Sequence, residues 1–257
     1  YLNDIDALCR WRDEHAPEKA VWVTEFGYDS STKTADREGK MPGWVGVTDE
    51  QQAQWLVRSL LMFAATPVER AYIYFFNDRD RPSLHASAGV TRNFQPKPSC
   101  HALAHLQRVL GDYRFGRVVA NEAGRLRVQE FEHGDDPDKV VWAVWSPTGE
   151  DRRFRHELTA VPGKLLTAER MPLGEELPLS GAATQRSDGA VDVEVTESPV
   201  YLVFQRNPSM TLSSPSISSA ARPLRAHELN AWLRALHPVP EPSVDRVTAG
   251  DPQEEVK

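Results

Sequence analysis

The sequence predicts an α/β region, then an all-β region, then a polar tail, and three observations support this order. Helical and strand-like patterns alternate over residues 1–111, which is typical of parallel strands joined by helices. Over residues 112–206 short strands recur with turn residues between them, as in a β-sandwich. Residues 207–257 are rich in serine, proline and acidic side chains, which indicates a linker or a largely disordered tail.

The first predicted strand, within residues 21–28, ends in a carboxylate. Side-chain alternation would place one set of residues on one face (Val21, Val23 and Glu25) and a second set on the other (Trp22, Thr24 and Phe26). Gly27 then allows the chain to turn. Glu25 is therefore predicted at the carboxyl end of a parallel strand, where barrels of alternating strands and helices carry their chemistry. The alternative is a solvated or salt-bridged glutamate without a catalytic role.

A helix over residues 2–16 precedes this strand, and a long polar loop over residues 29–48 follows it. A loop of this length inside a compact domain is usually functional or disordered, and its place after Glu25 favours function. Trp44, near the end of this loop, either stacks on a substrate or packs against the next helix.

The next helix begins at Thr48, which with Gln51 forms a capping-box pattern, and it ends near residue 65. A continuous apolar run over residues 71–76 follows, as expected for a strand covered on both faces. Polar groups come directly after it, at a second carboxyl end. Asp78 and Asp80 either contact substrate or form a surface cluster with the neighbouring arginines, Arg79 and Arg81.

A second long loop, residues 81–97, contains His85, which either contacts substrate or makes a structural hydrogen bond. A helix over residues 99–110 ends the α/β region. In the all-β region strands are predicted at 125–132, 140–146, 152–158, 164–170, 191–196 and 200–205. Trp142 and Trp145 have opposite parity, so we expect one to face the core and the other to face the first domain or solvent. In the tail, residues 227–236 could form one short helix.

Composition excludes several classes of protein. The net charge of -7 and the lack of a Lys/Arg-rich run argue against a nucleic-acid partner. No apolar run is long enough to span a bilayer. Cys9 and Cys100 are expected to be free and at least partly buried, and neither has metal-site spacing, so no metal or cofactor is indicated. The chain begins at Tyr1 within a helical pattern and without a signal-like segment, so we expect the later part of a longer protein.

Several motifs occur in an order that resembles a known family. They are the run 22–28, the segment 46–53 that leads into the second helix, the strand and loop 72–80, the Gly89-Val90-Thr91 and Gln95-Pro96-Lys97-Pro98-Ser99 segments, and Ser198-Pro199-Val200-Tyr201. Together they resemble the last two βα units of retaining glycoside hydrolases with a (β/α)8 barrel, followed by a β-sandwich as in family 39 and its cellulase-like relatives of clan A. The resemblance covers residues 1–206.

The resemblance implies a carbohydrate substrate and a double displacement with Glu25 as nucleophile. We expect the sugar to be contacted by residues of the two loops and strand ends, namely Tyr28, Trp44, Tyr74, Asn77 and His85. Glycan hydrolases with such appended sheets are often exported, which favours a secreted or periplasmic location for the parent protein.

The sequence also departs from the family. Residues 1–111 can hold only two of eight βα units. We therefore expect the chain to need the missing N-terminal barrel portion as a partner. In the enzymes of that family the acid/base glutamate follows an asparagine on the fourth barrel strand. In this sequence the Asn-Glu pair, Asn121-Glu122, lies in the all-β region instead. The tryptophan often found on the last strand is absent. We therefore expect the chain alone to be inactive.

Two alternatives remain open. One is a non-catalytic carbohydrate-binding or polysaccharide-assembly protein with a degenerate barrel. The other is a β-sandwich interaction module with a barrel remnant, whose open strand edges would leave the N-terminal half unfolded or dependent on another domain.

Overall fold

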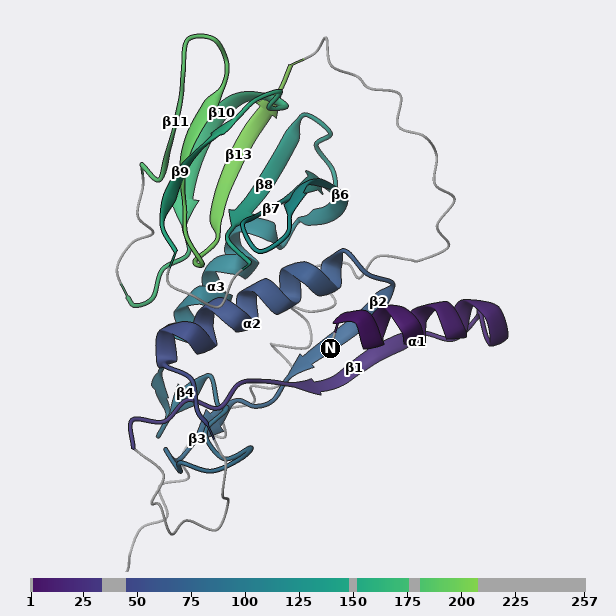
Figure 1. The fold of residues 1–257 in the computed structure, drawn as a ribbon, viewed down its shortest axis with the longest axis vertical. Helices are drawn as coiled ribbons and strands as arrows, with labels where there is room; N and C mark the ends of the chain where they lie inside the picture. The colour runs from purple at the N-terminus through teal and green to yellow at the C-terminus, as the bar shows by residue number, and fades with distance from the viewer. Residues whose placement is uncertain (1, 34–44, 148–151, 176–180, 208–257) are drawn as a thin grey trace, which may run out of the picture. The chain divides into compact units, whose positions relative to one another are not determined.

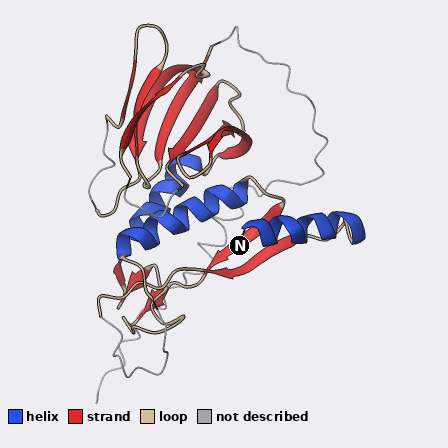
Figure 2. Cartoon of the chain, viewed as in Figure 1, coloured by secondary structure: helices blue, strands red, loops and turns tan. Residues whose placement is uncertain are grey.

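The computed structural model describes residues 2–33, 45–147, 152–175 and 181–207, which belong to one compact unit of the chain. The structure is mixed α/β, as predicted, and none of the described sheets closes on itself (Figures 1 and 2). The described helices are α1 (Leu2–His15), α2 (Asp49–Ala64) and α3 (Pro98–Leu110).

Strands β1 (Val21–Phe26) and β2 (Val68–Ile73) form a parallel two-stranded sheet, so the predicted parallel pairing is confirmed. One side of this sheet packs on α1 and α2 through an apolar cluster that includes Ile5, Leu56 and Phe63. The predicted position of the second strand, residues 71–76, is wrong by three residues at each end. The strand begins at Val68, and the rest of the apolar run, from Tyr74 on, lies beyond its end. Its residues are half-buried, apart from the exposed Glu69, rather than covered on both faces.

Helix α2 begins as predicted. The Thr48 hydroxyl accepts a hydrogen bond from the Gln51 amide, and the Gln51 side chain accepts one from the Thr48 amide, which completes a capping box. These two bonds satisfy amide groups that the first helical turn leaves without partners.

The loop between β2 and α3 contains more regular structure than the sequence predicts. Within it β3 (Asn77–Asp78), β4 (Thr91–Arg92) and β5 (Gln95–Pro96) form a small three-stranded sheet. Strands of two residues carry no detectable periodicity, which explains why the pattern of the sequence missed them.

The all-β region consists of two antiparallel sheets. The five-stranded sheet has the order β10-β13-β8-β7-β6, and the three-stranded sheet has the order β11-β12-β9. Their bounds are β6 (Tyr113–Glu122), β7 (Leu126–His133), β8 (Lys139–Trp145), β9 (Phe154–Leu158), β10 (Gly163–Arg170), β11 (Ala183–Gln185), β12 (Val191–Val195) and β13 (Val200–Arg206). Side chains of both sheets, including Trp142, Val193 and Leu202, share one apolar core. The six predicted strands all occur, whereas β6 and β11 were not predicted.

The other face of the five-stranded sheet packs on α2 and α3. Trp145 joins Val57 of α2 and Leu106 of α3 in this second cluster, while Trp142 lies in the core between the sheets. The predicted division of the two tryptophans between opposite faces is confirmed.

The remaining predictions concern cysteines, membrane spans and the tail. Cys9 is free and buried and Cys100 is free and half-buried, as expected. Within the described ranges, every helix falls short of the length and apolar character that crossing a bilayer requires. Trp44 and the helix predicted over 227–236 lie outside the described residues.

Candidate active site

A β-bulge near the end of β1 changes the direction in which Glu25 points. Val23 pairs with Ala71 and Phe26 pairs with Ile73, so three steps along β1 match two steps along β2. The extra residue brings Phe26 to the side of Val21 and Val23, where it is buried in the cluster with α1 and α2. The predicted alternation is therefore wrong beyond Val23, because a bulge inverts parity.

Since Phe26 faces the helices, its neighbour Glu25 takes the opposite side of the strand, the side of Trp22. Glu25 is exposed, and no other described residue forms a hydrogen bond or ion pair with its carboxylate. Bulges are common at barrel rims and beside active sites, where they redirect a side chain. The geometry thus presents a carboxylate at the carboxyl end of a parallel strand, on the face that the helices do not cover.

This uncovered face also carries an aromatic cluster that the sequence analysis did not identify. The Arg70 guanidinium lies 4.8 Å from the centroid of the Trp22 ring, and the Trp22 and Tyr72 rings lie 6.3 Å apart. Trp22 is 48% exposed, which is unusual for so large an apolar side chain within a strand. Arg70 and Tyr72 are two residues apart on β2, so side-chain alternation could have predicted that they share one face.

Gly27 brings the ends of the two strands into close contact. The Tyr74 amide donates to the Phe26 carbonyl over 2.7 Å. A Cβ atom at position 27 would lie 2.2 Å from the Tyr74 carbonyl oxygen, so no larger residue fits without a backbone shift. Tyr74 is thereby held next to the end of β1, directly beyond Glu25.

His85 is brought to Tyr74 by the loop between β2 and α3. The two rings are perpendicular, with centroids 6.3 Å apart, and His85 is exposed. Its backbone adopts a φ of 62° and its amide donates to Asp29 Oδ2 over 2.9 Å. The same carboxylate accepts from the Ser87 amide over 3.0 Å. Asp29, which the sequence analysis did not single out, therefore holds the loop that carries His85.

Two further predicted substrate residues, Tyr28 and Asn77, have partners elsewhere. The Tyr28 and Ser59 hydroxyls are 2.8 Å apart, and the Tyr28 ring packs edge-on against Trp55 of α2. Asn77 Oδ1 accepts from the Thr91 hydroxyl and from the Phe94 amide. The structure brings Tyr74 and His85 together at the end of β1, whereas the polar groups of Tyr28 and Asn77 bind other elements.

Asp78 and Asp80 do not form a surface cluster, so that interpretation is wrong. They are only 2% and 5% exposed. Asp80 accepts hydrogen bonds from Ser31 and Thr32, and Arg92 Nε lies 3.2 Å away. Burial raises the pKa of Asp80, but the hydrogen bonds from Thr32 and Ser31 and the charge of Arg92 outweigh it and lower the pKa to about 2.

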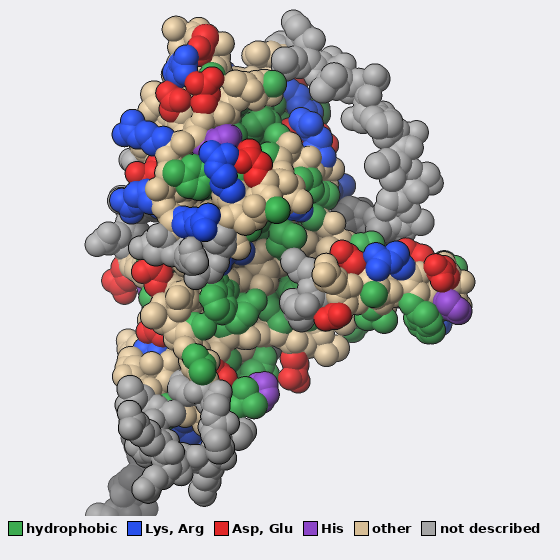
Figure 3. All heavy atoms as spheres, in the orientation of Figure 1, with side chains coloured by type: hydrophobic (Ala, Val, Ile, Leu, Met, Phe, Trp, Pro, Cys, Tyr) green, Lys and Arg blue, Asp and Glu red, His purple; other side chains and the backbone are tan. Residues whose placement is uncertain are grey.

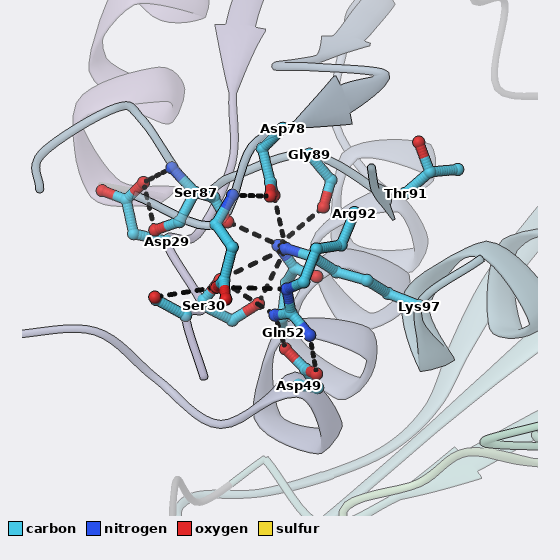
Figure 4. A network of polar contacts seen from close by, with 12 residues as sticks. Asp29, Ser30, Asp49, Gln52, Asp78, Ser87, Gly89, Thr91, Arg92 and Lys97 are labelled. Atoms are coloured by element: carbon cyan, nitrogen blue, oxygen red, sulfur yellow. Dashed lines mark hydrogen bonds and ion pairs between the residues drawn. The ribbon is translucent and has the colours of Figure 1, made fainter. Parts of the chain in front are cut away.

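Figure 4 shows the polar network to which Asp78 and Arg92 belong. Arg92 binds Asp49, at the start of α2, through two hydrogen bonds of 2.7 and 2.8 Å. The Gln52 side-chain amide, one turn along α2, donates through Nε2 to the Tyr28 and Gly89 carbonyls. The loops that follow β1 and β2 are thus tied to one another and to α2. In the part of the chain that the structure describes, no group of three or more His, Cys, Asp or Glu is arranged to hold a metal ion.

The described residues are similar in fold to solved structures of glycoside hydrolases. One similar solved structure is a family 39 glycoside hydrolase from the gut symbiont Bacteroides cellulosilyticus WH2, with 23% sequence identity and a TM-score of 0.56 over 77% of this chain and 37% of that chain. Another is the catalytic domain of the family 30 xylanase C from Talaromyces cellulolyticus, with 15% identity and a TM-score of 0.51 over 73% of this chain and 41% of that chain.

At these identities the similarity shows a shared fold. The chain spans about two fifths of the length of each of these two solved structures. Neither a protein-family model nor a curated protein matches this sequence.

Proposed function

We propose that this chain supplies the last two βα units and the appended β-sandwich of a retaining (β/α)8-barrel glycoside hydrolase, with Glu25 as its nucleophile. The observation that carries this proposal is the bulge in β1, which directs an exposed carboxylate at the carboxyl end of the strand to the side of Trp22. In such barrels the catalytic groups stand at the carboxyl ends of the strands.

In the proposed reaction the Glu25 carboxylate attacks the anomeric carbon, and the bond from that carbon to the leaving oxygen breaks. A second carboxylic acid, about 5–5.5 Å away, donates its proton to the leaving oxygen and later takes one from the water that releases the sugar. That acid would come from a barrel unit other than the two formed by β1 and β2.

The end of the β1–β2 sheet, beyond Glu25, fits a sugar. Tyr74 offers an apolar ring face with a polar edge, a combination suited to the C–H and O–H groups of a pyranose. His85 stands beside Tyr74 and is available to a sugar hydroxyl. Tyr28, Trp44 and Asn77 stay in the proposed substrate set, although the Tyr28 hydroxyl and the Asn77 carbonyl already have protein partners.

The proposed site is incomplete within this chain. A sheet of two strands, as described for β1 and β2, leaves unpaired backbone groups at its outer edges, and these groups require further strands for closure. We therefore expect the 257-residue chain to show no hydrolase activity by itself.

The test compares the 257-residue chain with the complete reading frame that contains it, each assayed on a panel of aryl glycosides. Activity is expected from the complete protein only. Glu25→Ala should abolish it, and azide should partly restore turnover as a glycosyl azide of inverted configuration. Glu69→Ala, an exposed carboxylate on β2, serves as the matched control and should keep full activity.

Two results would overturn the proposal. The first is activity that Glu25→Ala leaves unchanged. The second is a folded complete protein that binds oligosaccharides and cleaves none of the panel, which would instead support the carbohydrate-binding alternative.

A further inference from the structure

Lys97 occupies a position where a lysine is unfavourable for its own helix. It is the N-cap of α3 and makes no side-chain capping bond. Ser, Thr, Asp and Asn are preferred there, and a positive charge at a helix N-terminus opposes the helix dipole. A residue that breaks a local rule usually serves a need elsewhere in the structure.

The Lys97 side chain is buried among four acceptors. The side chain is 1% exposed, and its ammonium group lies 2.6 Å from Asp78 Oδ2. It also donates to the Ser30 carbonyl and hydroxyl over 3.2 and 3.1 Å, and to the Ser87 carbonyl over 3.0 Å. One cation thus binds the loop after β1, the end of β3 and the segment that follows His85 (Figure 4).

Asp78 is fixed as tightly as its partner. Its side chain is fully buried, and Oδ1 accepts from the Asp80 amide over 2.9 Å. A Cβ atom at Gly89 would lie 2.5 Å from the Asp78 amide nitrogen and 2.9 Å from Oδ2, so a glycine is required beside the ion pair. Burial lowers the pKa of Lys97, and the Asp78 charge and hydrogen bond oppose that shift.

The bonds continue from this pair to the candidate active site. The Ser30 amide donates to the Ser87 carbonyl, which Lys97 also binds. One residue earlier, the Asp29 carboxylate holds the His85 and Ser87 amides. The segment that leaves Glu25 and the segment that carries His85 are therefore joined at adjacent residues.

From these contacts we propose that the buried Lys97–Asp78 pair positions the candidate active site: it locks the loop after β1 to the loop after β2 and so fixes His85 relative to Glu25. The expected effect on catalysis rests on the proposed function, whereas the link between the two loops does not. Stability alone does not require such a pair, because well-packed neutral residues of similar volume often replace a buried ion pair without loss.

The test neutralises both partners at once, as Lys97→Met with Asp78→Asn, since removal of one partner alone would leave a buried charge and prevent folding. The matched control neutralises an ion pair of the all-β region, Arg170→Met with Glu194→Gln. Hydrogen exchange of the His85 and Ser87 amides in the full 257-residue chain should become about tenfold faster in the first variant and stay unchanged in the control. Unchanged exchange in a folded Lys97/Asp78 variant would overturn the proposal.

In the complete protein, kcat of the Lys97/Asp78 variant should fall about tenfold or more at a nearly constant KM, because misplaced groups lose mainly transition-state contacts. Rates are normalised to the fraction of enzyme that a 2-fluoro glycoside traps, so a smaller amount of folded enzyme is not counted as a slower one. Unchanged kcat with faster amide exchange would overturn the positioning role. A Glu25→Ala variant that keeps activity would refute the proposed function instead, and the exchange experiment would still decide on the lock.

Discussion

The two sheets that contact α2 are buried to very different extents. In β8 every residue after Lys139 is buried, whereas in β1 only Val21 and Phe26 are. The five-stranded sheet is covered on one face by the β11-β12-β9 sheet and on the other by α2 and α3. The β1–β2 sheet is covered by α1 and α2 on one face.

This difference separates a region that completes its own core from a region that does not. On the α/β side Trp22 is 48% exposed, and α1 exposes Leu8 and Trp11 at 50% and 56%. Figure 3 shows hydrophobic side chains of α1 at the surface beside charges of both signs. These exposed side chains belong to a sheet with one covered face and to a helix that covers it. The contrast agrees with the proposal that β1 and β2 belong to a larger barrel.

The sharpest test of this contrast truncates one aliphatic side chain in each region. Leu202→Ala should lower the free energy of unfolding by about 3 kcal/mol, because the side chain is fully buried between two sheets. Ile73→Ala on half-buried β2 should cost about 1 kcal/mol, since part of its surface already meets water. Urea unfolding measures both. Equal losses would show that the β1–β2 sheet is as well covered as the others.

A second test uses two glycines. Gly27→Ala should cost about 2 kcal/mol, because the new methyl group would overlap the Tyr74 carbonyl and push the two strand ends apart. Gly174→Ala is the control, since no atom lies within 4 Å of a Cβ at that position, and its unfolding midpoint should stay the same. A Gly27→Ala variant with unchanged thermal stability would contradict the close approach between β1 and Tyr74.

Hydrophobic periodicity predicted the helices and strands that are long enough to show a repeating pattern of apolar residues. The helices, the parallel pairing of the first two strands and the opposite faces of Trp142 and Trp145 all follow from spacing and length. Ten-residue β6 was missed because its exposed side carries mixed polar and apolar residues and two register shifts break its alternation.

The candidate site was only partly predictable for a related reason. Glu25 was selected as a candidate because a carboxylate at a strand end is conspicuous in the sequence. Its direction was not, because a bulge is set by the pairing of β1 with β2 and leaves no trace in the sequence of β1 alone. The roles of Asp29 and Lys97 depend on contacts between loops far apart in the chain, which spacing does not reveal.

The interface between α3 and the five-stranded sheet should make stability depend on pH. Burial lowers the pKa of His105, the nearby Arg108 charge lowers it further, and the hydrogen bond to Glu169 opposes both. Beside it the Tyr201 ring lies 5.3 Å from the imidazole. Below about pH 6.5 the unfolded chain takes up a proton that folded His105 resists, so the folded state loses stability as the pH falls.

We expect the free energy of unfolding to fall between pH 7 and pH 5 because of His105, as measured by urea unfolding at a series of pH values. His105→Gln should remove that part of the slope. His15→Gln, at an exposed histidine of α1, should leave it unchanged. An identical slope in the His105→Gln variant would mean that this histidine is protonated equally in both states.

The smallest expected effect concerns two tyrosine hydroxyls, one in the five-stranded sheet and one directly after β1. The Tyr201 hydroxyl is fully buried and has no hydrogen-bond partner among the described residues, whereas the Tyr28 hydroxyl is bonded to Ser59. Burial raises the pKa of Tyr201, consistent with a phenol in apolar surroundings. Tyr201→Phe should therefore leave stability unchanged or raise it by up to about 1 kcal/mol, and Tyr28→Phe should lower it by about 1 kcal/mol. The thermal unfolding midpoint of each variant tests these expectations. A clearly lower midpoint in Tyr201→Phe would contradict them, because it would reveal a hydrogen-bond partner for the Tyr201 hydroxyl.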